Sequence, residues 1–238
     1  MYGKKQVLSF FNIQRGFEMA RPRNEELYCK IKQAAYDLLL TVGFENTTYR
    51  SIADACGVTR TAVQNYYPSK TALALSFFED LLTAIRYSVE KNKLHQDSEF
   101  DTMFCIGQSF FMLLMSERGA RKLLLDLTSS RDITSDVLNF EYAWGVEFLS
   151  PERTVPDEQF MDDILVAMGG YYELLYNYLK SDRPFDVSAH LGQVVRAIMQ
   201  DYGYSYEDAK AYISSHALTS TDFDLIRKDV QVTLQQKI

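Results

Sequence analysis

A short run of hydrogen-bonding side chains is the most chemically suggestive feature of this 238-residue sequence. The helical spacing of Ala62, Val63 and Tyr67 places these apolar residues on one face, and the polar residues are left on the other. Guanidinium, amide and hydroxyl groups at the start of a short helix carry the donors and acceptors that read base edges in a DNA major groove. The polar residues are Thr59, Arg60, Thr61, Gln64 and Asn65.

The flanking sequence predicts elements that could hold this short helix in position. We expect a preceding helix over residues 48–56, capped by Thr47, with its apolar side chains facing inward. Gly57 allows the backbone of a tight turn, including a positive φ, and Thr59 can cap a helix that runs to about Tyr66. A helix, a tight turn and a second short helix form the layout of a helix-turn-helix.

Two longer helices are predicted around this pair. One begins near Asn24 and ends at Gly43, because it carries an apolar stripe at helical spacing. The other begins at Lys70, with Ser69 as its cap. The stripe of the first helix consists of Leu27, Ile31, Ala34, Ala35, Leu38 and Val42.

With these residues in register, the segment resembles the TetR/AcrR-type transcriptional regulators. The resemblance covers about residues 24–78 and implies an N-terminal DNA-binding domain followed by a helical domain that binds ligands and dimerises. Two positions depart from the family pattern, since Gln64 stands where Tyr is usual and Ser51 where an acidic residue is favoured. The matching residues are Ile31, Ala34, Ala35, Leu38, Gly43, Phe44, Thr47, Ile52, Ala53, Gly57, Val58, Thr59, Tyr67, Ser69, Lys70 and Leu73.

By this resemblance, eight residues are expected to contact DNA. Arg60, Thr61 and Asn65 would face base edges, and Arg60 could pair with guanine through both of its donors. The alternative for each position is a solvated surface residue. The expected phosphate contacts are Thr48, Thr59, Gln64, Tyr66 and Lys70.

The rest of the chain alternates long helical patterns with polar breaks, so we predict an all-α fold. Two of these helices, residues 157–180 and 187–202, resemble the dimerisation helices of the family. Gly169 and Gly170 in the first would fit a close subunit contact, a pocket wall or a kink. The other predicted helices cover residues 101–116, 119–130, 135–148, 206–217 and 222–235.

Residues 79–238 contain no catalytic or metal-binding sequence motif, and the three histidines are far apart in sequence. We therefore expect neither an enzyme nor a cofactor or metal. Aromatic and methionine side chains are abundant, and most fit an ordinary core. In a pocket of the kind that the family carries, six of them would contact a small-molecule effector: Phe110, Phe111, Met115, Tyr142, Trp144 and Tyr172.

Charge and composition agree with this division. Residues 1–77 hold 10 Lys and Arg against 6 Asp and Glu, whereas residues 78–238 hold 15 against 26. This charge distribution indicates that the basic N-terminal part binds a polyanion and that the acidic remainder has another role. Three widely spaced cysteines fit the reducing cytoplasm, and the longest apolar stretch is far below the roughly 18 residues of a membrane span.

The expected organisation is an N-terminal extension (1–20), a helix-turn-helix domain (21–78) and a helical effector-binding and dimerisation domain (79–238). The extension is either a mobile basic arm or a segment upstream of a true start at Met19. The expected function is a cytoplasmic homodimeric repressor that a small molecule releases from a double-stranded operator. The alternatives are a regulator of this type without such an effector and, more remotely, an all-α enzyme.

Overall fold

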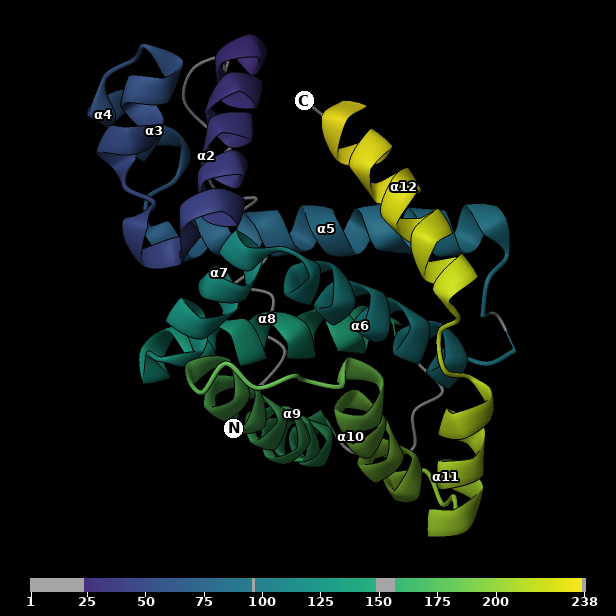
Figure 1. Ribbon diagram of the computed structural model, residues 1–238. Coiled ribbons are helices and arrows are strands. Elements are labelled where there is room, and N and C mark those ends of the chain that lie inside the picture. Colours follow the sequence, from purple (N-terminus) through teal and green to yellow (C-terminus); the bar gives the residue numbers. More distant parts are fainter. Residues whose placement is uncertain (1–23, 96, 149–156, 237–238) are drawn as a thin grey trace.

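The computed structural model describes residues 24–95, 97–148 and 157–236, and within these ranges the chain is all-α as predicted (Figure 1). The predicted extension over residues 1–20 lies outside this part. The helices are α2 (Glu25–Asn46), α3 (Tyr49–Cys56), α4 (Arg60–Tyr66), α5 (Lys70–Asn92), α6 (Glu99–Ser116), α7 (Arg118–Thr128), α8 (Arg131–Phe148), α9 (Asp157–Lys180), α10 (Val187–Asp201), α11 (Tyr206–Ser215) and α12 (Ser220–Gln236).

Local hydrogen bonding starts α4 and α5 where the sequence predicts them. Thr59 and Ser69 cap α4 and α5, accepting from the backbone N–H groups of Ala62 and Ala72. The expected cap Thr47 is wrong, because Thr48 caps α3 and the buried Thr47 instead donates its hydroxyl to the carbonyl of Gly43 at 2.8 Å. Gly43 breaks the helical path of α2 with φ 81° and ψ 178°, and one more helical turn follows it.

Helices α2, α3 and α4 form a small bundle at one end of α5, the long helix that crosses the molecule (Figure 1). The bundle closes over apolar residues that are almost fully buried, including Ile31, Leu39, Ile52 and Val63. Since α5 continues unbroken from this bundle to Asn92, the expected domain boundary at residue 78 falls within a helix.

The remaining helices build the larger part below and across α5 (Figure 1). Helix α6 packs on α5 and α10, while α9 packs against α7, α8 and α10, and α12 returns to cross α5 (Figure 1). A row of aromatic rings runs through this core from Tyr36 in α2 to Tyr171 in α9, with consecutive ring centroids 4.7–5.9 Å apart. The two parts therefore share one continuous apolar interior. None of the described helices combines the length and the apolar character needed to cross a membrane.

Candidate nucleic-acid interface

The turn between α3 and α4 has the geometry that its sequence predicts. Gly57 ends α3 in the left-handed region, with φ 67° and ψ 36°, where a side chain would be disfavoured. The N–H of Val58 then donates to the carbonyl of Ala53 at 3.0 Å, and the half-buried Val58 packs on the core. Thr59 accepts from the N–H of Ala62 at 3.2 Å and starts α4 at once. The turn thus fixes the angle at which α4 leaves α3.

Helix α4 has one buried and one exposed face. Val63 has no exposed surface, and Tyr67 at its end is 4% exposed. The predicted base-reading residues Arg60, Thr61 and Asn65 are exposed, together with Gln64 and Thr59. The structure therefore leaves all five polar residues of the predicted run exposed to solvent.

The start of α3 explains one departure from the family pattern. Ser51 is uncharged, unlike the acidic residue that the family favours, yet it completes a capping box. Its Oγ accepts from the N–H of Thr48 at 3.0 Å. In return, Oγ1 of Thr48 accepts from the N–H of Ser51 at 3.0 Å. An acidic residue at this third helical position would accept the same bond, so the serine preserves the local structure. Thr48 itself remains exposed.

The two remaining predicted contacts, Tyr66 and Lys70, are half-buried at the margin of the exposed face. The Tyr66 hydroxyl donates to the carbonyl of Asn24 at 3.4 Å. The ammonium of Lys70 donates to the carbonyl of Glu45 at 3.2 Å and lies 4.5 Å from the ring centre of Phe44. Both side chains therefore fasten α2 to the end of the helix-turn-helix.

The sequence pattern does not single out two further residues at this surface. Arg50 lies in the first turn of α3 with its side chain 87% exposed, 3.8 Å from Asp54. Tyr49 precedes it, and its hydroxyl is buried without a hydrogen-bond partner among the described residues. Burial raises the pKa of Tyr49, and the charge of Arg60 partly opposes this shift. A basic residue in the first turn of the first helix was the signal that could have drawn attention to Arg50.

The six predicted effector contacts lie in or against the core of the larger part. Phe110, Phe111, Tyr142 and Tyr172 are buried, whereas Met115 and Trp144 are half-buried. Of these six, Tyr172 alone lines the small hollow of about 10 Å³ found here, which Phe78, Leu124, Leu127, Thr128, Thr134 and Val137 also surround. A volume of this size holds about one water molecule. Four of the six predicted effector contacts thus belong to the core, and Met115 and Trp144 pack against it.

An acidic side chain that sequence reasoning overlooked lies beside Tyr172. The hydroxyl of Tyr172 donates to Oε1 of Glu141, and Oε2 is buried without a partner among the described residues. Burial raises the pKa of Glu141 to about 8, although the hydrogen bond from Tyr172 lowers it in part. No local pattern in the sequence distinguishes this glutamate from a solvated one.

Where the sequence predicted no metal ligands, the structure brings Asp97 and Asp101 next to His216, more than 100 residues away in the chain. This cluster lies at the opposite end of α5 from the helix-turn-helix (Figure 1).

Comparison with known proteins identifies the N-terminal part. Residues 31–77 match the family model described as bacterial regulatory proteins, tetR family, which supports a regulatory rather than an enzymatic protein. Among solved structures, the chain is similar to the fatty acid degradation regulator FadR from Bacillus halodurans, at 16% identity and a TM-score of 0.42, covering 74% of this chain and 95% of that one. It is also similar to a gamma-butyrolactone receptor (ArpA like protein), at 16% identity and a TM-score of 0.34, covering 90% and 100%. A search of curated proteins gives no match.

Proposed function

We propose that this DNA-binding transcriptional regulator, whose residues 31–77 form a domain of the tetR family, is a homodimeric repressor acting in the cytoplasm. In the dimer, two helix-turn-helix domains would bind the half-sites of a near-palindromic operator. The solvent-exposed polar side chains of α4, on a helix that Val63 and Tyr67 anchor in the core, are the observation that carries this proposal. The three free cysteines Cys29, Cys56 and Cys105 are consistent with a reducing compartment.

The contacts to DNA divide into two classes. Arg60, Thr61 and Asn65 would reach base edges in the major groove, with Arg60 forming both hydrogen bonds to a guanine. The other five residues would bind phosphates and fix the register of the domain without reading sequence. These five are Thr48, Thr59, Gln64, Tyr66 and Lys70. Arg50 is a further candidate for a phosphate contact, since its guanidinium is exposed at the start of α3.

The dimer would form through α9 and α10. Val166, Gly170 and Leu174 lie at helical spacing on the face of α9 opposite its core residues, and Val166 is 78% exposed. No described atom lies within 4 Å of a Cβ built on Gly169 or Gly170, so close packing within the subunit does not account for these two glycines. Helices α9 and α10 of two copies would form a four-helix bundle, in which Gly170 lets the backbones approach.

Helix α7 offers a route by which the larger part could control the DNA-binding domain. On one side, Oδ2 of Asp126 accepts from the N–H of Glu45 at the end of α2 at 2.9 Å. On the other side, Leu124 and Leu127 line the hollow beside Tyr172. An effector that binds better when this hollow is enlarged would displace α7 and change the position of α2. Such a ligand would shift the dimer away from DNA by its differential affinity for the two arrangements.

The close packing around Tyr172 favours a second mode of control. The hollow of about 10 Å³ is far smaller than the roughly 300–1,000 Å³ of ordinary ligand pockets. A regulator without a small-molecule effector, controlled by a protein partner or by its own abundance, would need no larger space. A screen of metabolites for release of the protein from its operator separates the two modes, because only the first predicts a compound that lowers operator affinity.

Operator selection tests the function itself. The full chain would be incubated with fragments of genomic DNA, and the bound fragments would be sequenced and footprinted. We expect protection of a near-palindrome whose half-sites are separated by whole helical turns. Binding without any sequence preference would contradict a sequence-specific regulator.

A further inference from the structure

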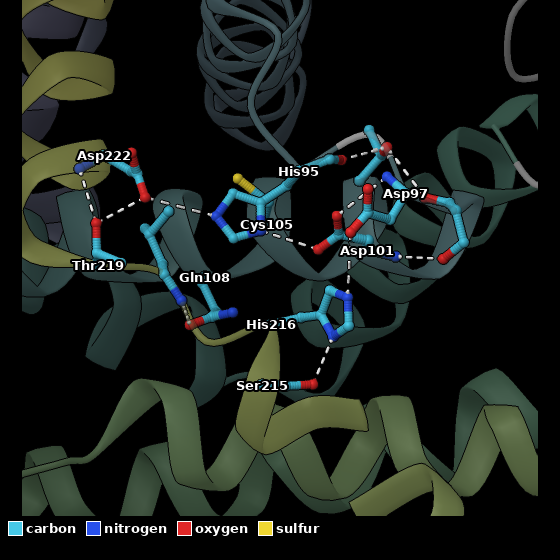
Figure 2. A network of polar contacts seen from close by, with 12 residues as sticks. His95, Asp97, Asp101, Cys105, Gln108, Ser215, His216, Thr219 and Asp222 are labelled. Atoms are coloured by element: carbon cyan, nitrogen blue, oxygen red, sulfur yellow. Dashed lines mark hydrogen bonds and ion pairs between the residues drawn. The ribbon is translucent and has the colours of Figure 1, made fainter. Parts of the chain in front are cut away.

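The turn that joins α5 to α6 meets the turn that joins α11 to α12 at the end of α5 distant from the helix-turn-helix (Figures 1 and 2). The first turn supplies His95 and Asp97, and Asp101 follows in the first turns of α6. The second turn supplies His216 and is followed by Asp222 in α12. Two of the three histidines of the chain and three carboxylates thus come together from distant parts of the sequence.

Three of these side chains have the spacing of ligands around one ion. One oxygen each of Asp97 and Asp101 and one ring nitrogen of His216 all lie within 4.8 Å of one another. Oδ2 of Asp97 is 3.6 Å from Nε2 of His216. This distance is close to the about 3.4 Å that separates two ligands of a tetrahedral ion with bonds of about 2.1 Å.

The hydrogen bonds of His216 leave the correct nitrogen free for a metal. Its Nδ1 lies 2.7 Å from the carbonyl oxygen of Tyr212 and 2.9 Å from Oγ of Ser215, which donates its own proton to the same carbonyl. Because both oxygens can then only accept, Nδ1 carries the proton. In the neutral ring, the lone pair is then on Nε2, which faces Asp97. The ring is also stacked on Tyr212, with centroids 3.9 Å apart. A backbone carbonyl that fixes the tautomer in this way is the usual outer-shell partner of a metal-bound histidine.

The carboxylate of Asp101 is also held in place, and it is 1% exposed. Oδ1 of Asp101 lies 2.9 Å from Nδ1 of His95, and Oδ2 accepts from the N–H of Asp97 at 3.3 Å. Nε2 of His95 in turn lies 3.7 Å from Oδ2 of Asp222 (Figure 2). His95 therefore orients the buried carboxylate from behind, as outer-shell groups orient metal ligands.

We propose that Asp97, Asp101 and His216 bind one divalent first-row transition-metal ion of the Zn²⁺ class. Two carboxylates and a neutral imidazole bring two negative charges to a dication, and the imidazole favours zinc, nickel or iron over calcium or magnesium. The side chain of Asp97 is 85% exposed, which gives the ion a path from solvent and leaves room for water as a further ligand. The bound ion would link the start of α6 to the segment between α11 and α12.

Titration of the full chain, treated with a chelator and then dialysed, tests the site with Zn²⁺ by calorimetry and with Co²⁺ by visible absorption. We expect one saturable site per chain. Asp97→Asn and His216→Gln should each weaken binding by more than the roughly 10- to 100-fold that loss of an outer-shell partner costs, and His95→Gln should fall within that range. His190→Gln is the matched control, because this third histidine lies against Phe185 with ring centroids 4.5 Å apart, and not in the cluster.

The exposed position of Asp97 keeps the test decisive, because its replacement by Asn should leave folding intact even if the buried Asp101 cannot be changed. Thermal melts with Zn²⁺ and with chelator provide the second readout, since an ion that binds the folded chain raises its melting temperature. The proposal is overturned if no saturable binding is found, if Asp97→Asn and His216→Gln bind as tightly as the original chain, or if His190→Gln weakens binding to the same degree.

Discussion

Gly119 of α7 lies directly against the backbone of Leu40 in α2. A Cβ built on Gly119 would be 1.8 Å from the carbonyl oxygen of Leu40 and 2.5 Å from its carbonyl carbon. Only a residue without a side chain allows the two helices to approach so closely. This contact joins α2, the first described helix of the DNA-binding domain, to the helix that borders the core of the larger part.

Gly119→Ala should therefore force α7 away from α2. The obstructing atoms belong to the backbone of Leu40 and cannot rotate away. We therefore expect the free energy of unfolding to fall by about 1–3 kcal/mol, as at other overpacked sites. Urea unfolding measures it. Gly145→Ala is the control, because no described atom lies within 4 Å of a Cβ there and alanine raises helix propensity by about 1 kcal/mol. Equal stability of the two variants would contradict the close contact.

Val166→Asp should separate the subunits without unfolding them. Val166 is 78% exposed in the single chain, so a carboxylate costs little there, but at a subunit interface it would be buried without a partner. Sedimentation at micromolar concentration should show a dimer for the original chain and a species near 27.5 kDa for the variant. Val232→Asp, at a 45% exposed position on α12, should remain dimeric. A monomeric original chain would refute the interface through α9 and α10.

Arg60→Ala should impair sequence recognition more than general DNA affinity. The guanidinium fork matches the two acceptors of guanine, so its loss should cost roughly 1–3 kcal/mol per half-site on the operator and much less on scrambled DNA. Because Arg60 is exposed, stability should change by less than about 0.5 kcal/mol. The affinities of the variant and the original chain for the operator and for scrambled DNA, together with their melting temperatures, test this prediction. An equal loss on both duplexes would assign Arg60 to phosphate binding and shift base reading to Thr61 and Asn65.

Lys70→Ala should instead weaken binding to operator and scrambled DNA alike. A phosphate contact releases counterions. The slope of log affinity against log salt concentration should therefore become shallower by about one per half-site in the variant. The variant also loses the hydrogen bond to the carbonyl of Glu45, which should loosen the end of α2. Lys210→Ala on α11 is the matched control and should leave the slope unchanged. An unaltered slope in Lys70→Ala would show that this lysine has only the structural role.

Glu141→Gln should remove a pH dependence of stability. Burial raises the pKa of Glu141 from 4.5 to about 8 in the folded chain, so the folded state holds a proton that the unfolded state loses. The stability from this group is complete below pH 4.5 and is lost as the pH rises to 8, by up to about 1.4 kcal/mol per pH unit. Urea unfolding at pH 5, 6, 7 and 8 measures the free energy of unfolding of both chains. The value for the variant should rise relative to that of the original chain at each step in pH. Parallel curves would mean that Glu141 does not titrate in this way.

The sequence by itself determined the helix-turn-helix and the orientation of its polar face. Thr59, Ser69 and Gly57 act through backbone bonds to residues a few positions away, and the spacing of Val63 and Tyr67 decides which side chains remain outside. Such interactions depend on local sequence alone, so they can be predicted from it. The prediction of Thr47 as cap is wrong because the next residue, Thr48, accepts the capping bond, while the hydroxyl of Thr47 is bonded to the carbonyl of Gly43.

The contacts between distant segments were decided by the tertiary structure alone. Gly119 meets Leu40, and His216 meets Asp97 and Asp101, only because α7 and the segment after α11 pack where they do. The same packing fills the space around Tyr172 and buries Glu141 beside it. The type of a residue does not determine which side chains from other helices pack against it, nor the volume that remains between those side chains. These relationships arise from how whole helices fit together, which no local spacing encodes.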